Sequence, residues 1–188
     1  MDIQTLTVGM IGTNCYILSN ENARECAVID PGDEADRIRR AAGGKRIAAI
    51  LLTHGHFDHI GAVDALREEG TRVLIHPLDA PMLRNAELNA SRGLIGRDIR
   101  VSAAAEPVRE GDRLMLAGIS FEVLHTPGHT PGGVCYLTGE HLFTGDTLFE
   151  HGWGRTDLPG GSRSDIMRSL RRLLPLAKKY AIHPGHEA

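Results

Sequence analysis

Cysteine is scarce in this chain of 188 residues, and its three cysteines, Cys15, Cys26 and Cys135, lie far apart. Their odd number and their apolar, strand-like surroundings indicate buried thiols rather than a disulfide framework. This use of cysteine is typical of a reducing compartment and predicts a cytoplasmic protein.

Long apolar runs and an excess of charge are also missing. No stretch approaches the ~20 apolar residues of a membrane-spanning helix, and Met1–Thr5 lacks the features of a signal peptide. The net charge is −3, and Arg168, Arg171 and Arg172 fit the solvated face of one helix rather than a basic patch. The sequence therefore predicts a small-molecule substrate, with no nucleic acid or membrane partner, and leaves the oligomeric state open.

Histidine and aspartate are grouped instead. The segment His54-Gly55-His56-Phe57-Asp58-His59 holds four potential metal ligands and follows an apolar run, 47–52, that is typical of a buried strand. Residues two apart in an extended chain project to the same side, so His54 and His56 can bind one ion. Asp58 and His59 come after the chain has turned, which indicates a second ion.

Three further candidates, His129, Asp146 and His186, lie in Gly-rich loops at the ends of apolar runs. Imidazole and carboxylate without thiolate suit Zn, Fe or Mn rather than a Cys-rich structural zinc site. Together with the first motif, these residues predict a site for two divalent metal ions. The other five histidines are expected to be ordinary core or surface residues: His76, His125, His141, His151 and His183. Of these, His125 and His183 flank the ligand loops.

Short apolar runs alternate with helical patterns and Gly/Pro punctuation, and we see no internal linker. Every candidate ligand follows a predicted strand, so the ligands are expected to converge on one edge of a sheet core. Helices are expected at 33–42, at 60–70 and around 166–174, where Pro175 should end the last one. The irregular region Asp79–Ala105 fits either a substrate-side lid or a poorly ordered surface excursion. Strands are expected at 15–18, 26–30, 47–52, 113–116, 119–124, 134–137, 141–144 and 180–182.

These motifs resemble the metallo-β-lactamase superfamily, and within it the glyoxalase II-like (hydroxyacylglutathione hydrolase-like) branch of small metallo-hydrolases. The resemblance implies an α/β fold, a four-layer αβ/βα sandwich of two mixed β-sheets flanked by helices, with residues 1–188 as a single domain. The C-terminal helical domain that binds glutathione in full glyoxalase II enzymes has no counterpart in this sequence. The resemblance covers nearly the whole chain, at 13–16, 28–32, 51–61, 125–132, 145–149, 154–161 and 184–186.

The resemblance also implies how the ligands divide. Zinc is the expected metal, and the same ligands accept Fe or Mn. Asp58 would in addition help to orient the attacking water. The first metal would be held by His54, His56 and His129, the second by Asp58, His59 and His186, with Asp146 bridging the two.

The expected activity is hydrolysis of thioesters of the S-lactoylglutathione type by a hydroxide that bridges the two metals. A thiol of pKa ~8.5 leaves without a strong general acid. The alternative is a persulfide dioxygenase-like oxidoreductase with one iron held by His54, His56 and His129 or Asp146, because two imidazoles and a carboxylate suit Fe(II) and dioxygen. Such relatives share the Gly-Arg-Thr-Asp loop found at 154–157.

Three other possibilities are less favoured. A β-lactamase of the common type would carry Cys at position 146, and RNA-processing relatives carry extra domains or an exosite arm. A non-catalytic, metal-stabilised binding module would not need an intact set of seven ligands. The sequence thus predicts a dinuclear metallo-hydrolase and leaves its physiological substrate open.

Overall fold

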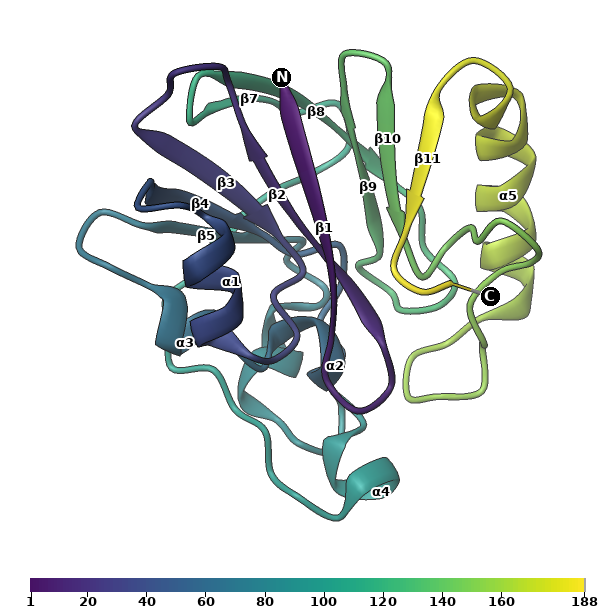
Figure 1. The fold of residues 1–188 in the computed structure, drawn as a ribbon. Helices are drawn as coiled ribbons and strands as arrows, with labels where there is room; N and C mark the ends of the chain where they lie inside the picture. Colours follow the sequence, from purple (N-terminus) through teal and green to yellow (C-terminus); the bar gives the residue numbers. More distant parts are fainter. Residues whose placement is uncertain (188) are drawn as a thin grey trace.

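Two β-sheets packed face to face form the centre of the molecule, and helices cover their outer faces (Figure 1). The computed structural model describes residues 1–187. The expected sandwich of two mixed sheets flanked by helices is therefore confirmed. No helix in the described part of the chain is long and apolar enough to cross a membrane.

The first sheet contains six strands in sequence order. The first three pair antiparallel, and the last four pair parallel. The sequence did not indicate the first, fifth and sixth strands, which are short or flank the stronger apolar runs. The strands are β1 (Asp2–Val8), β2 (Thr13–Ser19), β3 (Glu25–Ile29), β4 (Arg46–Leu51), β5 (Arg72–Ile75) and β6 (Glu106–Pro107).

The second sheet contains five strands in the order β11-β10-β9-β8-β7. Only the β10–β11 pair is parallel within this sheet. Both predicted hairpins, β7–β8 and β9–β10, are confirmed. The strands are β7 (Arg113–Leu116), β8 (Ile119–His125), β9 (Val134–Thr138), β10 (His141–Gly145) and β11 (Ala181–Pro184).

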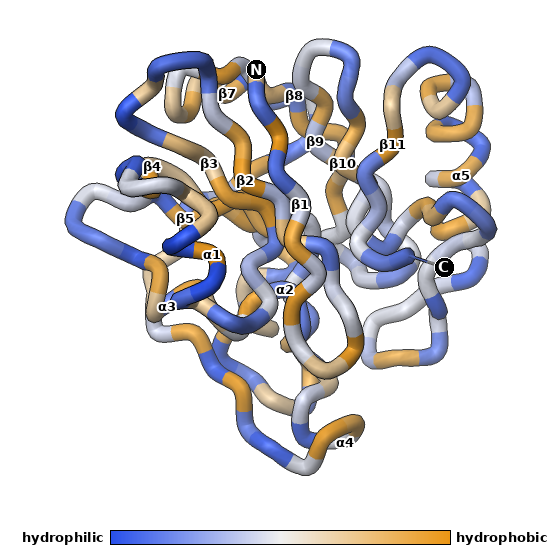
Figure 2. The backbone as a smooth tube through the Cα atoms, viewed as in Figure 1, coloured by the Kyte–Doolittle hydropathy of each residue, from blue (hydrophilic) through white to orange (hydrophobic). Residues whose placement is uncertain are grey.

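The apolar residues of the inner strands serve two layers at once. In β2, Cys15 and Ile17 pack with the helices α1 (Ala35–Ala41) and α3 (Val63–Leu66), whereas Tyr16 and Leu18 pack between the sheets. Successive strand residues point to opposite faces, so a strand buried on both faces is apolar throughout. Figure 2 shows hydrophobic residues concentrated on the inner strands of the two sheets.

The helix α5 (Arg163–Ala177) covers the outer face of the second sheet, where Ile166, Leu170 and Leu173 are buried against β8, β9 and β10. The prediction that Pro175 ends this helix is wrong, because Pro175 lies inside it. Proline has no N–H to donate to the carbonyl of Arg171, four residues earlier in the helix. Both residues are exposed, so the Arg171 carbonyl can accept a hydrogen bond from water. The buried face holds the last turn in place.

The single helix expected at 60–70 is two short helices, α2 (Phe57–Ile60) and α3, separated by Gly61 and Ala62. The Ala62 N–H donates to the Pro31 carbonyl instead of continuing a helix. A Cβ on Gly61 would lie 2.3 Å from the carbonyl oxygen of Gly32. Close packing against the β3–α1 loop therefore breaks the helix.

The region Asp79–Ala105 is held by its own contacts. It contains the 3-10 helix η1 (Ala80–Arg84) and α4 (Ser91–Ile95), and the buried Asn89 side chain donates to the carbonyls of Met82 and Ile99. The segment hangs from the end of the molecule where the β1–β2 loop also lies (Figure 1). The region is therefore a structured part of the fold rather than a poorly ordered excursion.

Candidate metal centre

The seven predicted ligands come together in the loops that follow four strands of both sheets. The β4 loop and α2 carry His54, His56, Asp58 and His59, and the loops after β8, β10 and β11 carry His129, Asp146 and His186. The expected convergence on one edge is therefore present.

The first cluster contains His54, His56 and His129, with one nitrogen from each ring lying within 4.8 Å of the others. All three side chains are buried, and His56 Nδ1 lies 2.9 Å from His129 Nε2. Two tetrahedral ligands, each about 2.0–2.1 Å from a zinc ion, are about 3.3 Å apart. The spacing suits one shared ion.

The second cluster contains Asp58, His59 and His186. Asp58 Oδ2 lies 3.2 Å from His59 Nε2 and 3.1 Å from His186 Nε2, and the two Nε2 atoms are 3.3 Å apart. Thr13 Oγ1 donates to the same Asp58 oxygen over 2.8 Å and fixes the carboxylate. These atoms can also surround one ion.

The Asp146 carboxylate lies between the two clusters. Its Oδ2 is 3.4 Å from His129 Nε2 and 3.5 Å from His186 Nε2, and its Oδ1 is 3.3 Å from His59 Nε2. Gly185 permits this approach, because a Cβ there would lie 2.1 Å from Asp146 Oδ1. One carboxylate thus faces both ligand groups.

Three buried atoms in this centre have no hydrogen-bond partner: His54 Nε2, His56 Nε2 and Asp146 Oδ1. Buried polar atoms are nearly always paired, so each exception calls for an explanation. A cation bound between His54 Nε2 and Asp146 Oδ1 would supply what those two atoms lack, whereas His56 faces His129 through its other nitrogen, Nδ1. The donor set therefore fits divalent metal ions.

Four of the five candidate ligand histidines place Nδ1 next to a protein oxygen, which leaves Nε2 free to bind an ion. Partners of this kind fix the orientation of a metal-binding imidazole. The pairs are His54 with Thr53 Oγ1 at 3.1 Å, His59 with Asp30 Oδ2 at 2.9 Å, His129 with the Arg155 carbonyl at 2.7 Å, and His186 with the Gly12 carbonyl at 3.3 Å.

The electrostatics differ between the clusters. Burial lowers the pKa of His54 well below its usual value, and burial next to His129 lowers the pKa of His56 to about 3. Burial would also lower the pKa of His59, but Asp58 and the other nearby carboxylates outweigh it and raise that pKa. His54 and His56 therefore offer neutral imidazoles, the form that binds metals.

Asp30 is a site residue that the sequence analysis did not single out. It accepts hydrogen bonds from Thr53 N at 2.8 Å and Thr53 Oγ1 at 2.6 Å, and it faces His59 Nδ1. Asp30, His54 and His59 are themselves close enough to hold an ion. However, both Asp30 oxygens are already engaged, so Asp30 positions His59. In the sequence, the feature that could have pointed to Asp30 is its position as a carboxylate directly after a buried strand and before Pro31.

Asp79 is the second residue that was missed, and it is fully buried. Its Oδ2 accepts from Gly55 N at 3.1 Å and Thr130 Oγ1 at 2.6 Å, and its Oδ1 accepts from Gly132 N at 2.6 Å. Gly55 stands between two predicted ligands, and Thr130 follows His129. One carboxylate therefore connects the two loops that supply the first cluster.

The histidines expected to be bystanders lie outside both clusters. His76 stacks on His125, with ring centroids 4.2 Å apart, and His141 Nδ1 lies 2.9 Å from His183 Nε2. The three cysteines are free and buried, as predicted. Burial raises the pKa of Cys26 to about 11, so its thiol is not poised as a nucleophile.

A cavity of about 230 Å³ opens in front of the ligands. His56, Asp58, His129, Asp146 and His186 line it on the ligand side, and α4 and the loops after β1 and β10 supply the rest of its wall. This cavity therefore gives a small molecule access to the candidate metal ligands.

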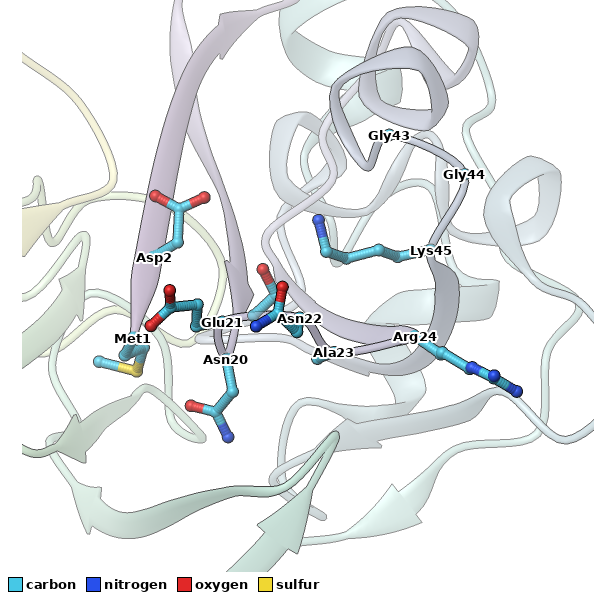
Figure 3. A pocket seen from close by; sticks show the side chains of 11 residues that line it. Met1, Asp2, Asn20, Glu21, Asn22, Ala23, Arg24, Gly43, Gly44 and Lys45 are labelled. Atoms are coloured by element: carbon cyan, nitrogen blue, oxygen red, sulfur yellow. The ribbon is translucent and has the colours of Figure 1, made fainter.

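A larger hollow lies elsewhere, between the β2–β3 and α1–β4 turns, with a volume of about 900 Å³. It adjoins Ser19, whereas Thr13, at the other end of the seven-residue strand β2, contacts Asp58 of the metal centre. A strand of this length spans about 20 Å, so the hollow lies far from the candidate metals. Figure 3 shows that the carboxylates of Asp2 and Glu21 lie apart from Lys45 and that Arg24 points away from them. Its side chains do not converge on one ligand.

A His- and Asp-lined centre between the ends of two packed sheets, with Asp146 facing two ligand groups, defines a metallo-hydrolase type of site. The chain belongs to the metallo-beta-lactamase superfamily, whose family model matches residues 8–186. This superfamily contains metallo-hydrolases that bind divalent metals.

Among curated relatives, the chain is similar to hydroxyacylglutathione hydrolase GloC of Haemophilus influenzae. The two are 35% identical over 99% of this chain and 91% of the relative. Among solved structures it resembles the BLEG-1 B3 metallo-beta-lactamase, with a TM-score of 0.91 and 36% identity over 100% of this chain and 92% of the other.

Two further structures bear on the metal and on the chemistry. TTHA1623, solved in a di-iron-bound form, has a TM-score of 0.85 and 38% identity over 98% of this chain and 92% of the other. ETHE1 from Myxococcus xanthus has a TM-score of 0.81 and 32% identity over 100% of this chain and 76% of the other.

Proposed function

We propose that the protein is a dinuclear metal-dependent hydrolase of thioesters of the S-lactoylglutathione type. The observation that carries this proposal is the pair of ligand clusters with the Asp146 carboxylate between them, where buried His54 Nε2 and Asp146 Oδ1 have no hydrogen-bond partner among residues 1–187. The similarity to a hydroxyacylglutathione hydrolase supports the choice of a thioester.

The proposed ligands of the first ion are His54, His56 and His129, and those of the second are Asp58, His59 and His186, with Asp146 shared. Zinc suits imidazole and carboxylate donors, and the di-iron form of TTHA1623 supports iron as a second possibility. Two bound cations would polarise the thioester carbonyl and lower the pKa of water towards ~7.

The residues of the chain orient the reactants. Thr13 holds Asp58 at the cavity wall, where the carboxylate can accept a hydrogen bond from a water molecule and direct its lone pair to the carbonyl carbon. No protein acid is needed for the leaving thiol, which departs as a thiolate of pKa ~8.5. A serine or cysteine nucleophile is not required either.

The second candidate is a persulfide dioxygenase-like oxidoreductase with one iron on His54, His56 and His129 or Asp146. The structural similarity to ETHE1 from Myxococcus xanthus is the observation that favours this second candidate. It gives no role to the second cluster, in which Asp58, His59 and His186 are brought within 3.3 Å of one another. We therefore favour the hydrolase.

The deciding experiment combines metal analysis with activity on three substrates. We expect close to two metal ions per chain, hydrolysis of S-lactoylglutathione, little activity on a cephalosporin, and no oxygen uptake with glutathione persulfide. One iron per chain with oxygen uptake would replace the hydrolase by the dioxygenase. A full metal complement without turnover of any thioester, ester or lactam would indicate a binding module.

A further inference from the structure

Exposed apolar side chains surround the mouth of the cavity in front of the metal centre. Ile11 and Leu94 both line the cavity, yet they are 48% and 50% exposed. They come from the β1–β2 loop and from α4, and Figure 2 shows hydrophobic residues on both segments. Single exposed apolar residues need no explanation. Two from separate loops that face one cavity indicate a binding surface.

The wall behind these residues is apolar as well. Phe57, Phe149 and Leu158 complete it, from α2, from the segment after β10 and from the loop before α5. Apart from Arg155, the polar side chains of the cavity are candidate metal ligands. A molecule bound here therefore places an apolar part against the wall and its reacting group against the metals.

The charge of the cavity argues against an anionic acyl group. Within residues 1–187, its only lysine or arginine is Arg155. The Asp157 carboxylate accepts from Arg155 Nε at 2.6 Å and from the terminal guanidinium nitrogen at 2.7 Å. Arg155 is thus already paired with a carboxylate of the chain, and no other lysine or arginine among residues 1–187 lines the cavity to receive an anionic acyl group.

The size of the cavity limits the length of the chain that it holds. Its 230 Å³ is below the roughly 300–1,000 Å³ of pockets for drug-sized ligands. A short to medium alkyl chain fits inside, whereas a long fatty chain would extend past the rim. The cavity matches a group of a few carbons.

We propose that this cavity binds the acyl chain of the substrate and selects thioesters of neutral, apolar acyl groups of short to medium length. This inference rests on the proposed thioester hydrolysis. In the reaction the carbonyl carbon gains a bond to the oxygen of water and loses its bond to sulfur, so one thioester and one water give a carboxylate, a thiol and a proton. The acyl chain stays against the apolar wall throughout.

The test is a series of thioesters of one short, neutral thiol that carry acetyl, butyryl, hexanoyl and D-lactoyl groups. A buried methylene contributes about fourfold in affinity, so four methylenes give at most about 200-fold. We expect kcat/KM of the metal-loaded protein to rise at least tenfold from acetyl to hexanoyl, with lactoyl below butyryl. A flat or falling series overturns the inference and leaves the hydrolase intact. No turnover across the whole series overturns the hydrolase and this inference with it.

Leu94 and Leu174 form a matched pair of variants. Leu174 is 52% exposed, like Leu94, but it lies on α5, away from the cavity. Leu94→Asp should lower the ratio of the hexanoyl value of kcat/KM to the acetyl value at least tenfold. Leu174→Asp should change neither. Equal losses on both thioesters with Leu94→Asp overturn the role of the apolar rim.

A binding measurement separates recognition from turnover. Trp153, the only tryptophan of the chain, adjoins Gly154 of the cavity wall and is 49% exposed, so its fluorescence can report occupation. Non-hydrolysable hexyl and ethyl thioethers of the same thiol are titrated into the metal-loaded protein. We expect at least tenfold tighter binding of the hexyl compound, and loss of that difference in Leu94→Asp. Equal binding of the two thioethers overturns the inference.

Discussion

Asp79 offers the sharpest test of how the fold builds the metal centre. Its carboxylate is the common acceptor for three donors, one from the His54–His56 turn and two from the loop after His129. Asp79→Ala removes this acceptor and leaves the N–H groups of Gly55 and Gly132 and the Thr130 hydroxyl without a partner in a buried place. The variant should therefore affect both stability and metal binding.

The magnitude follows from the number of donors. Each buried donor left unsatisfied costs about 1–3 kcal/mol. Burial raises the pKa of Asp79, so removing the carboxylate also removes a desolvation cost, which offsets part of the loss. We expect the free energy of unfolding of the metal-free protein to fall by about 3–5 kcal/mol, a large share of the about 5–15 kcal/mol of a typical domain.

Metal binding should weaken as well, because His129 is no longer held in register with His54 and His56. Loss of a group that orients ligands typically costs about 10–100-fold in metal affinity. The assays are urea unfolding in the presence of a chelator, and competitive zinc titration of the folded variant. Asp79→Asn keeps the shape and one acceptor oxygen, and it should fall between wild type and Asp79→Ala in both measurements.

Asp64 provides the control. It accepts two backbone N–H bonds, from Ser102 and Ala103, but it is exposed and lies on α3. Asp64→Ala leaves donors that water can reach, so it should cost about 1 kcal/mol or less and leave metal affinity unchanged. If Asp79→Ala behaves like Asp64→Ala in both assays, the carboxylate does not hold the two loops together and the reasoning is refuted.

Four further predictions address the site. Asp146→Ala should lower the affinity for both ions, as metal analysis after dialysis would show; a variant that keeps two tightly bound ions would exclude the shared role. Gly185→Ala should also weaken metal binding, because a Cβ would lie 2.1 Å from Asp146 Oδ1, and equilibrium titration with zinc would reveal an unchanged affinity if this is wrong. His141→Ala, which alters a histidine paired with His183 outside both clusters, should leave the metal content at the wild-type level, and loss of metal would mean that ligands and bystanders were divided incorrectly. With the acyl group held constant, glutathione and neutral-thiol thioesters should differ less than about fivefold in kcat/KM, since a rim charge contributes about 0–1 kcal/mol, and a thousandfold preference for glutathione would reveal a dedicated site.

Local sequence patterns predicted most of the strands and the group of candidate ligands, whereas the sandwich followed from the family resemblance. Buried strands appear as apolar runs such as 47–52, and the ligands directly follow such runs, as His54 follows β4. The family resemblance supplied what periodicity cannot, namely how the two sheets pack. The proposed assignment of each ligand to one ion came from that resemblance and still awaits metal analysis.

The sequence could not predict features that depend on contacts between distant segments. Asp79 becomes a buried acceptor only because the loops after β4 and β8 meet above it, and nothing near Asp79 in sequence signals this. The break between α2 and α3 likewise depends on Gly61 packing against Gly32. Pro175 was misjudged for a related reason, since its tolerance follows from exposure and from the buried face of α5.

The origin of the ligands in both sheets has a consequence for how the chain holds together. The strands of the first sheet lie within residues 2–107 and those of the second within 113–184, so each half of the chain forms one sheet with its own helices, and each proposed ion would be bound by residues of both halves. Metal ions would then link the two halves in addition to the apolar packing and the hydrogen bonds of Asp79 between them. Two separately expressed halves should reassemble more tightly with metal than with chelator, since an ion that binds only the assembled form stabilises it in proportion to RT ln(1 + [L]/Kd).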